Sequence, residues 1–124
     1  MRIRHFATTL FEARGIEYTI DIQKNIHEVR LPMEYRQHIY LILKEAINNL
    51  VKYAGASEAF IRVSFDDKYL VLTVRDNGVG FSESGGTGNG IPGMRRRAEL
   101  MQAEVGIVSS TGAGTSIELR VNIL

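Results

Sequence analysis

The sequence contains no cysteine, which excludes disulfide bonds, thiolate metal sites and thiol-based catalysis. It also lacks a charge excess: 15 basic and 14 acidic residues leave a net charge of +1, so no overall field favours nucleic acid or a membrane surface. No apolar run approaches the roughly 18 residues of a transmembrane helix, and the N-terminus lacks the apolar core of a signal peptide. These absences predict a soluble cytoplasmic domain that contacts neither nucleic acid nor the membrane directly.

What is present is an ordinary globular composition, 44% apolar and 23% charged, in 124 residues. That length suits a single domain with its own hydrophobic core. The first residues read as the middle of a helix, so we expect the chain to be a fragment of a longer protein. Residues 1–15 are predicted to be the end of a linker helix, and residues 16–124 to form one domain that is monomeric when isolated.

Apolar periodicity predicts an α+β fold, a two-layer α/β sandwich with helices on one face of a mixed, mainly antiparallel sheet. In the first helix, Phe6, Leu10 and Ala13 follow helical spacing, and Gly15 ends the segment. The predicted helices are residues 3–13, 32–53 and 92–101, and the predicted strands are residues 17–22, 59–65, 69–75, 105–109 and 116–121.

The helix predicted over residues 32–53 has two different faces. An apolar stripe is predicted to be buried and consists of Ile39, Ile42, Leu43, Ala46, Ile47, Leu50 and Ala54. On the opposite face, Glu45, Asn49 and Lys52 follow each other at i, i+4 and i+7. Such residues usually form a solvated helix face, but asparagine is a poor helix former, and this argues for a specific role of Asn49.

The polar face offers the groups that a metal–phosphate site needs. Asn49 presents a side-chain oxygen to Mg²⁺, a cation that takes oxygen ligands and keeps several waters. Lys52 offers a point charge to phosphates. Glu45, one turn earlier, would hold a metal-bound water, and Tyr53 would place its ring beside a base or ribose.

The segment Asp76-Asn77-Gly78-Val79-Gly80 ends an alternating strand. A carboxylate at the strand end can accept a hydrogen bond from the exocyclic amine of adenine, and it repels the carbonyl that guanine carries at the same place. Gly78 and Gly80 let the backbone turn and let a flat ring approach closely. The alternative is an ordinary turn, because Asn-Gly is a common turn pair.

A glycine-rich segment follows at residues 88–93 and matches the pattern G-x-G-x-x-G. A dinucleotide-binding fingerprint must follow a strand and open a βαβ unit, whereas this segment follows a Ser/Gly loop near the end of the chain. We expect instead that Gly88 and Gly90 expose backbone amides before a helix and form a phosphate cradle, the alternative being a plain surface loop. Three arginines at 95–97 would then need phosphate or an acidic partner surface to offset their charge.

Together these motifs resemble the nucleotide site of the Bergerat-fold ATPases: histidine kinases, gyrase B-type topoisomerases, heat-shock chaperone ATPases and mismatch-repair ATPases. Asn-x-x-Lys-Tyr at residues 49–53 resembles the asparagine box of histidine kinases, and Gly112-x-Gly114-Thr115 resembles the last glycine box. The spacing is most similar to the ATP-binding catalytic domain of a bacterial sensor histidine kinase. The short loop before residue 92 resembles the nitrate-sensor and membrane-fluidity-sensor class, from which Tyr53 and Arg96 depart.

The resemblance implies ATP and Mg²⁺ as cofactors. Catalytic roles fall on Glu45, Asn49 and Lys52, of which Glu45 and Asn49 would hold the metal. Nucleotide contacts fall on Asn49, Lys52, Tyr53, Asp76, Asn77, Gly78, Gly80, Gly88, Gly90 and Thr115. Within this set Asp76 would select adenine, while Asn77 and Thr115 would support the base site, Thr115 by ordering a water from the final strand.

The implied reaction is transfer of the γ-phosphoryl group to a histidine on a separate dimerisation helix, with a response regulator as a further partner. The parent protein can be anchored in the inner membrane. None of His5, His27 and His38 is expected to be the acceptor. Three alternatives stay open: an ATP hydrolase in which Glu45 activates water, a serine-directed anti-sigma-type kinase, and a non-catalytic nucleotide-binding docking module.

Overall fold

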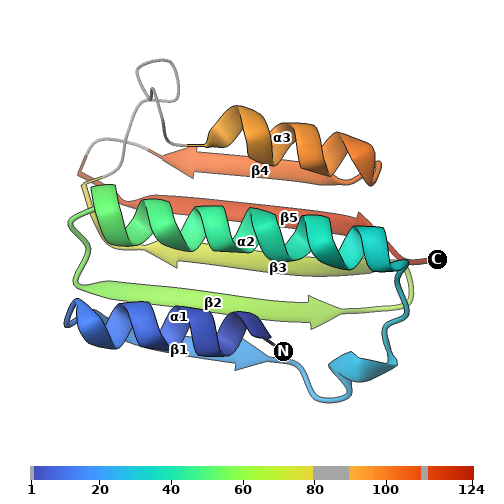
Figure 1. The fold of residues 1–124 in the computed structure, drawn as a ribbon, viewed down its shortest axis with the longest axis horizontal. Coiled ribbons are helices and arrows are strands. Elements are labelled where there is room, and N and C mark those ends of the chain that lie inside the picture. Colours follow the sequence, from blue (N-terminus) through green and yellow to red (C-terminus); the bar gives the residue numbers. More distant parts are fainter. Residues whose placement is uncertain (1, 80–89, 110–111) are drawn as a thin grey trace.

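A computed structural model of the chain describes residues 2–79, 90–109 and 112–124 (Figure 1). Pro32 precedes the longest helix as its N-cap residue, as its position in the sequence predicted. In chain order the described elements are α1 (Arg2–Ala13), β1 (Glu17–Ile22), the 3₁₀ helix η1 (Ile26–Glu28), α2 (Met33–Tyr53), β2 (Glu58–Phe65), β3 (Tyr69–Asp76), α3 (Ile91–Leu100), β4 (Glu104–Ser109) and β5 (Thr115–Asn122).

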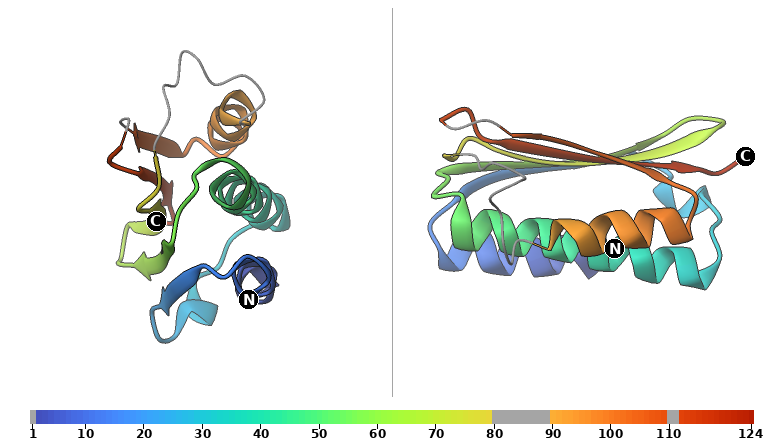
Figure 2. Two further views of the ribbon diagram at one scale, coloured as in Figure 1. Left: turned by 90° about the vertical axis from the view of Figure 1, so that its left-hand side faces the viewer. Right: turned by 90° about the horizontal axis from the view of Figure 1, so that it is seen from above.

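The strands form one sheet in the order β1-β2-β3-β5-β4. Strands β1 and β2 run parallel, since α2 carries the chain back between them, and the other neighbouring strands run antiparallel. The three α-helices of the described residues cover one face of the sheet, and in this part of the chain no helix lies on the other face (Figure 2). This arrangement confirms the predicted α+β sandwich with its mixed, mainly antiparallel sheet.

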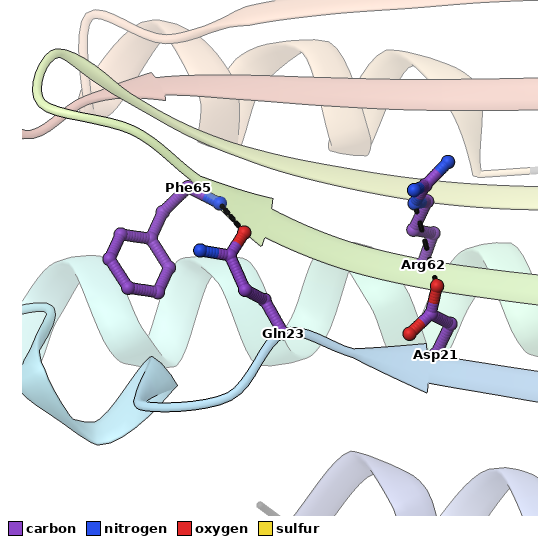
Figure 3. A network of polar contacts seen from close by, with 4 residues as sticks. All are labelled: Asp21, Gln23, Arg62 and Phe65. Carbon is purple, nitrogen blue, oxygen red and sulfur yellow. Dashed lines mark hydrogen bonds and ion pairs between the residues drawn. The ribbon is translucent and has the colours of Figure 1, made fainter.

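Edge strand β1 is joined to β2 by polar contacts as well as by the strand pairing (Figure 3). The side-chain oxygen of Gln23 accepts a hydrogen bond from the Phe65 N–H at 2.9 Å. Arg62 lies 3.6 Å from the carboxylate of Asp21, and both side chains are more than half exposed. An exposed ion pair of this kind contributes little to stability, so the edge is held mainly by its backbone ladder.

The core lies between the helices and the sheet. All seven residues predicted for the α2 stripe are buried, which confirms that face of the helix. They pack on aliphatic cross-strand rows, of which one is Ile61, Val74, Ile117 and Ile107, and the next is Val63, Leu72, Leu119 and Val105.

The fully buried residues of α1 are not the ones whose helical spacing was noted in the sequence. Phe6 and Leu10 are only partly buried and Ala13 is exposed, whereas the core residues of this helix are Ile3, Ala7 and Phe11. Both sets follow helical spacing, and contacts with neighbouring elements decide between them. The ring of Phe11 lies 5.6 Å from that of Tyr18 on β1, and Phe6 lies beneath the Lys44 ammonium of α2 at 5.5 Å.

The C-terminal end of α1 matches the prediction. Gly15 has φ +68°, and the N–H of Ile16 donates to the carbonyl of Phe11 at 2.9 Å, which closes the helix. Within the described residues, no helix combines the length and the apolar character that crossing a bilayer requires.

Candidate functional site

Polar side chains form the last cross-strand row on the helix-covered face of the sheet. Asp76, at the end of β3, pairs with Thr115 of β5, and Thr115 pairs with Ser109 of β4. We call Asp76, Thr115 and Ser109 the terminal row. Side chains alternate along a strand, so these residues point to the same face as the aliphatic rows described above. The register confirms the predicted position of Thr115 beside Asp76.

Asp76 is half-buried and is held by backbone donors. Its Oδ1 accepts a hydrogen bond from the Gly78 N–H at 2.8 Å, and the backbone N–H of Thr115 also bonds to the carboxylate. Burial raises the pKa of Asp76, and the two backbone hydrogen bonds offset part of that rise. A partly desolvated carboxylate fixed in this way is a directional acceptor for an N–H group.

We expect an NMR titration of the free domain to place the pKa of Asp76 above its ordinary value of 3.8 and that of Asp66 below 3.8. Asp66 is exposed in the β2–β3 hairpin, where hydrogen bonds from the backbone N–H groups of Tyr69 and Lys68 lower its pKa. By linkage, the stability contributed by Asp76 is present below pH 3.8 and is lost as pH rises through its folded-state pKa. The stability contributed by Asp66 is present above pH 3.8 and is lost as pH falls through the folded-state pKa of Asp66. The reverse order of the two pKa values would contradict this assignment.

Gly78 is required by the close approach of β3 to the end of α2. A Cβ at this position would overlap the carbonyl oxygen of Ala54, and the N–H of Val79 donates to the same oxygen at 2.8 Å. On the other side, the N–H of Gly112 donates to the carbonyl of Val79. The end of β3 is therefore fixed between the C-terminus of α2 and the β4–β5 connection.

Asn77 joins β3 to the segment that leads into β2. Its Oδ1 accepts hydrogen bonds from the N–H groups of Ser57 at 3.0 Å and Glu58 at 2.9 Å, and its Nδ2 donates to Ser57 Oγ at 3.0 Å. These bonds fix the backbone next to Asp76. The role predicted for Asn77 in supporting a base site stays a prediction, and these bonds are the contacts through which it would act.

Thr115 is 8% exposed, and its Oγ1 lies 3.0 Å from Ser109 Oγ. The residue before it, Gly114, has φ +81°, and a Cβ there would overlap the carbonyl oxygen of Asp76. Ser109 was not among the predicted site residues. The strand alternation could have indicated it, because Val105, Ile107 and Ser109 occupy one face of β4.

The polar face of α2 reaches the start of α3. Glu45 and Asn49 are partly buried and Lys52 is exposed. The N-cap residue of α3 is Gly90, with φ +75°, and a Cβ on it would overlap the Glu45 carboxylate. Glu45 therefore lies where a helix dipole favours negative charge. Gly80 and Gly88, together with the side chain of Tyr53, fall outside what the structure describes.

We expect Gly90→Ala to cost about 1–3 kcal/mol of unfolding free energy, because the left-handed conformation disfavours a side chain and Glu45 must move. Gly55→Ala is the matched control, since Gly55 has φ +60° with nothing within 4 Å of an added Cβ. Adding Glu45→Ala should remove the steric part of the Gly90→Ala cost and leave the conformational part. Urea unfolding of the single and double variants measures this coupling, and strict additivity would contradict the contact.

Two of the three arginines of α3 have contacts within the fold. Arg97 Nη1 lies 3.3 Å from His38 Nδ1 on α2, and Arg95 Nη1 donates to the carbonyl of Val105 at 3.4 Å. A guanidinium only donates, so the His38 Nδ1 in this contact is the acceptor. The charge at 95–97, for which the sequence suggested phosphate or an acidic partner, thus also serves to hold α3 on α2 and β4.

A hollow of about 580 Å³ lies near the same end of the sheet but belongs to its other side. Among its lining residues, Thr19, Phe60 and Arg75 are cross-strand neighbours that point away from the helices. Asp76 and Asn77 also line the hollow, at the end of β3. The Arg75 guanidinium lies 5.1 Å from the centre of the Phe60 ring. The terminal row and the polar face of α2 share the helix-covered side, so the candidate site is there.

Comparison with known proteins relates the chain to one ATPase family and to the fold of two histidine kinases. The family described as "Histidine kinase-, DNA gyrase B-, and HSP90-like ATPase" matches residues 34–123. The histidine kinase domain of the blue-light activated histidine kinase of Erythrobacter litoralis EL346 superposes with a TM-score of 0.79 at 20% identity, over 97% of this chain and 58% of that one. Histidine kinase AdeS of Acinetobacter baumannii gives a TM-score of 0.79 at 14% identity, over 98% of this chain and 61% of that one. At these identities the structures establish a common fold, and the chain spans about three-fifths of each.

Proposed function

Because the chain belongs to the family of histidine kinase-, DNA gyrase B- and HSP90-like ATPases, we propose that it is the Mg-ATP-binding catalytic domain of a sensor histidine kinase. The fold shared with two histidine kinases supports the choice of kinase within this family. In the proposed reaction a histidine nitrogen on a separate dimerisation helix attacks the γ-phosphorus. A P–N bond forms, the bond to the bridging oxygen breaks, and ADP leaves.

The observation that carries the proposal is the half-buried Asp76 carboxylate in the terminal row. It is acceptor-only when ionised, and it would accept a hydrogen bond from the exocyclic amine of adenine. Guanine presents a carbonyl oxygen at that position, which would place two acceptors against each other at a cost of about 1–3 kcal/mol. Thr115 is the adjacent polar group, and Asn77 holds the backbone beneath.

The phosphates would lie between α2 and the start of α3. The oxygens of Asn49 and Glu45, both partly buried on one face of α2, suit Mg²⁺, which takes oxygen ligands. Magnesium, when bound, would neutralise charge that develops on the phosphates. Lys52 would add a positive charge to the same oxygens. The backbone N–H groups that open α3 after Gly90 would point toward the phosphates.

The partners follow from the proposed reaction. The phosphoacceptor helical domain of the same kinase would supply the histidine, and a response regulator would take the phosphoryl group in two-component signalling. Within the chain, His38 faces the Arg97 guanidinium, which suits a structural role better than that of an acceptor. A cytoplasmic domain inside a membrane-anchored parent protein is compatible with the proposal.

The test is phosphoryl transfer between separately purified domains. The chain mixed with the helical domain of its parent and Mg-[γ-³²P]ATP should place acid-labile phosphate on the helical domain, whereas the chain alone should release little inorganic phosphate. Asn49→Ala should abolish transfer while preserving the fold. Steady release of inorganic phosphate by the chain alone, lost in Glu45→Ala, would instead establish a hydrolase.

A further inference from the structure

We propose that the outer edge of β1 binds an extended basic segment of a partner protein, whose lysine or arginine side chains contact Glu17 and Glu58. The segment would continue the sheet beyond β1, on the side opposite β2. A strand edge, two glutamate carboxylates and the hollow beside them support this interaction surface. It goes beyond the nucleotide-binding function and does not depend on it.

Strand β1 lies at one edge of the sheet, and among the described residues no strand pairs with its outer side (Figure 1). The N–H of Glu17 donates to the carbonyl of Ser57, and the N–H of Gln23 donates to that of Val63. In a parallel ladder every second residue bonds to the same neighbour, so the residues between turn their N–H and C=O groups to the outer side. These residues are Tyr18, Ile20 and Ile22. Such a row of main-chain donors and acceptors is a template for an added strand.

The charge beside this edge is negative and is not neutralised within the described fold. Glu17 and Glu58 are directly opposite each other in the register of β1 and β2, and both are exposed. Like charges at opposed positions destabilise a sheet. Asp21, further along β1, is paired with Arg62 (Figure 3), whereas neither glutamate has an ion pair with any described residue. A cation from outside the chain would relieve the repulsion.

The hollow of about 580 Å³ is lined by both glutamates and has room for a long side chain. More acidic than basic side chains line it, although the whole chain has a net charge of +1. The partly buried ring of Phe60 offers an apolar surface to the methylene stem of lysine or arginine. No group of three His, Asp or Glu side chains suited to a metal ion occurs in the described residues. A side-chain cation on an extended segment therefore fits this surface better than a bare ion.

The test uses a capped pentapeptide of alternating arginine and threonine. Its control carries citrulline, which is neutral and has nearly the same shape, at each arginine position. NMR titration of the ¹⁵N-labelled chain at about 20 mM salt, where exposed charges are weakly screened, should show binding of the arginine peptide only. The bound peptide should slow hydrogen exchange at the amides of Tyr18 and Ile20, which gain acceptors. The amide of Thr19 already faces β2 and should exchange as before.

The double variant Glu17→Gln/Glu58→Gln should weaken binding of the arginine peptide about tenfold, within the range for two exposed ion pairs. The matched control is Asp21→Asn/Glu118→Gln, which removes from the same face two carboxylates that already have cationic partners in the chain. This control should weaken binding about twofold at most. If the first double variant fails to fold, Glu17→Gln and Glu58→Gln are measured singly, with about threefold weakening expected for each.

Several results would overturn the proposal. Equal binding of the citrulline peptide would show that charge is not recognised, and equal weakening in the two double variants would show a general attraction of charge. Displacement of the peptide by an equal concentration of spermidine would assign the hollow to a small cation. Failure of both peptides to bind, with slow exchange at Tyr18 and Ile20 only in a dimer of the chain, would assign the edge to a second copy. Failure of both peptides without dimerisation would leave the edge without the proposed partner.

Discussion

Asp76→Asn is expected to lower the affinity for ATP about 10- to 100-fold, the range for losing a hydrogen bond to a charged group. The substitution keeps the size of the side chain but removes the negative charge. It also offers an NH₂ group where the exocyclic amine of adenine needs an acceptor. Isothermal titration with Mg-ATP measures the change, and circular dichroism shows whether the fold is retained.

Asp66→Asn is the matched control for that experiment. Asp66 accepts two backbone hydrogen bonds of 2.8 Å in the β2–β3 hairpin, at the opposite end of β3 from Asp76. Its replacement should change stability without changing ATP affinity. Undiminished binding by Asp76→Asn would refute base recognition by this carboxylate. An equal loss in Asp66→Asn would show that the effect is general destabilisation.

Gly114→Ala should produce the largest loss of stability among the glycine substitutions, about 3 kcal/mol or more. The residue has φ +81°, at which a side chain costs about 1–2 kcal/mol. In addition, the new Cβ would overlap the carbonyl oxygen of Asp76, a main-chain atom that can move only if β3 moves. Overpacking of this kind costs a further 1–3 kcal/mol.

Gly112→Ala separates the two contributions, because Gly112 has the same φ of +81° but nothing within 4 Å of an added Cβ. Urea unfolding should give a loss of about 1–2 kcal/mol for Gly112→Ala, and a clearly larger loss for Gly114→Ala. Any folded Gly114→Ala protein should also bind ATP more weakly, because Asp76 is displaced. Equal losses in the two variants would mean that the loop relaxes without disturbing β3.

The fold was predictable wherever periodicity alone determines burial. In α2 and in β3 the apolar residues follow a single periodic pattern. The burial of both elements in the structure follows the pattern read from the sequence. Helix α1 has two apolar sets at helical spacing, Ile3 with Phe11 and Phe6 with Leu10. Which set is buried depends on where β1 and α2 lie, and that is tertiary information absent from the local pattern.

The site was predictable where residues are neighbours in a motif or in a strand pair. The position of Thr115 beside Asp76 follows from the motifs at the end of β3 and the start of β5. Contacts between distant segments could not be predicted from the sequence. Asn77 bonds to a loop 20 residues earlier, and Glu45 on α2 lies against Gly90 at the start of α3. Such contacts depend on loop paths that no spacing rule encodes.

Because the helices cover one face of the sheet, the two faces of each strand should tolerate substitutions to different degrees. Along β3, Val74 and Asp76 face the helices and the site, whereas Thr73 and Arg75 between them point to the face without helices. Exchanges should therefore be accepted at every second strand position, which leaves the core and the terminal row intact. In a complete substitution scan, positions that tolerate exchange should alternate along each strand with positions that do not. The same alternation would allow chains that share only 14–20% sequence identity with this one to have the same fold.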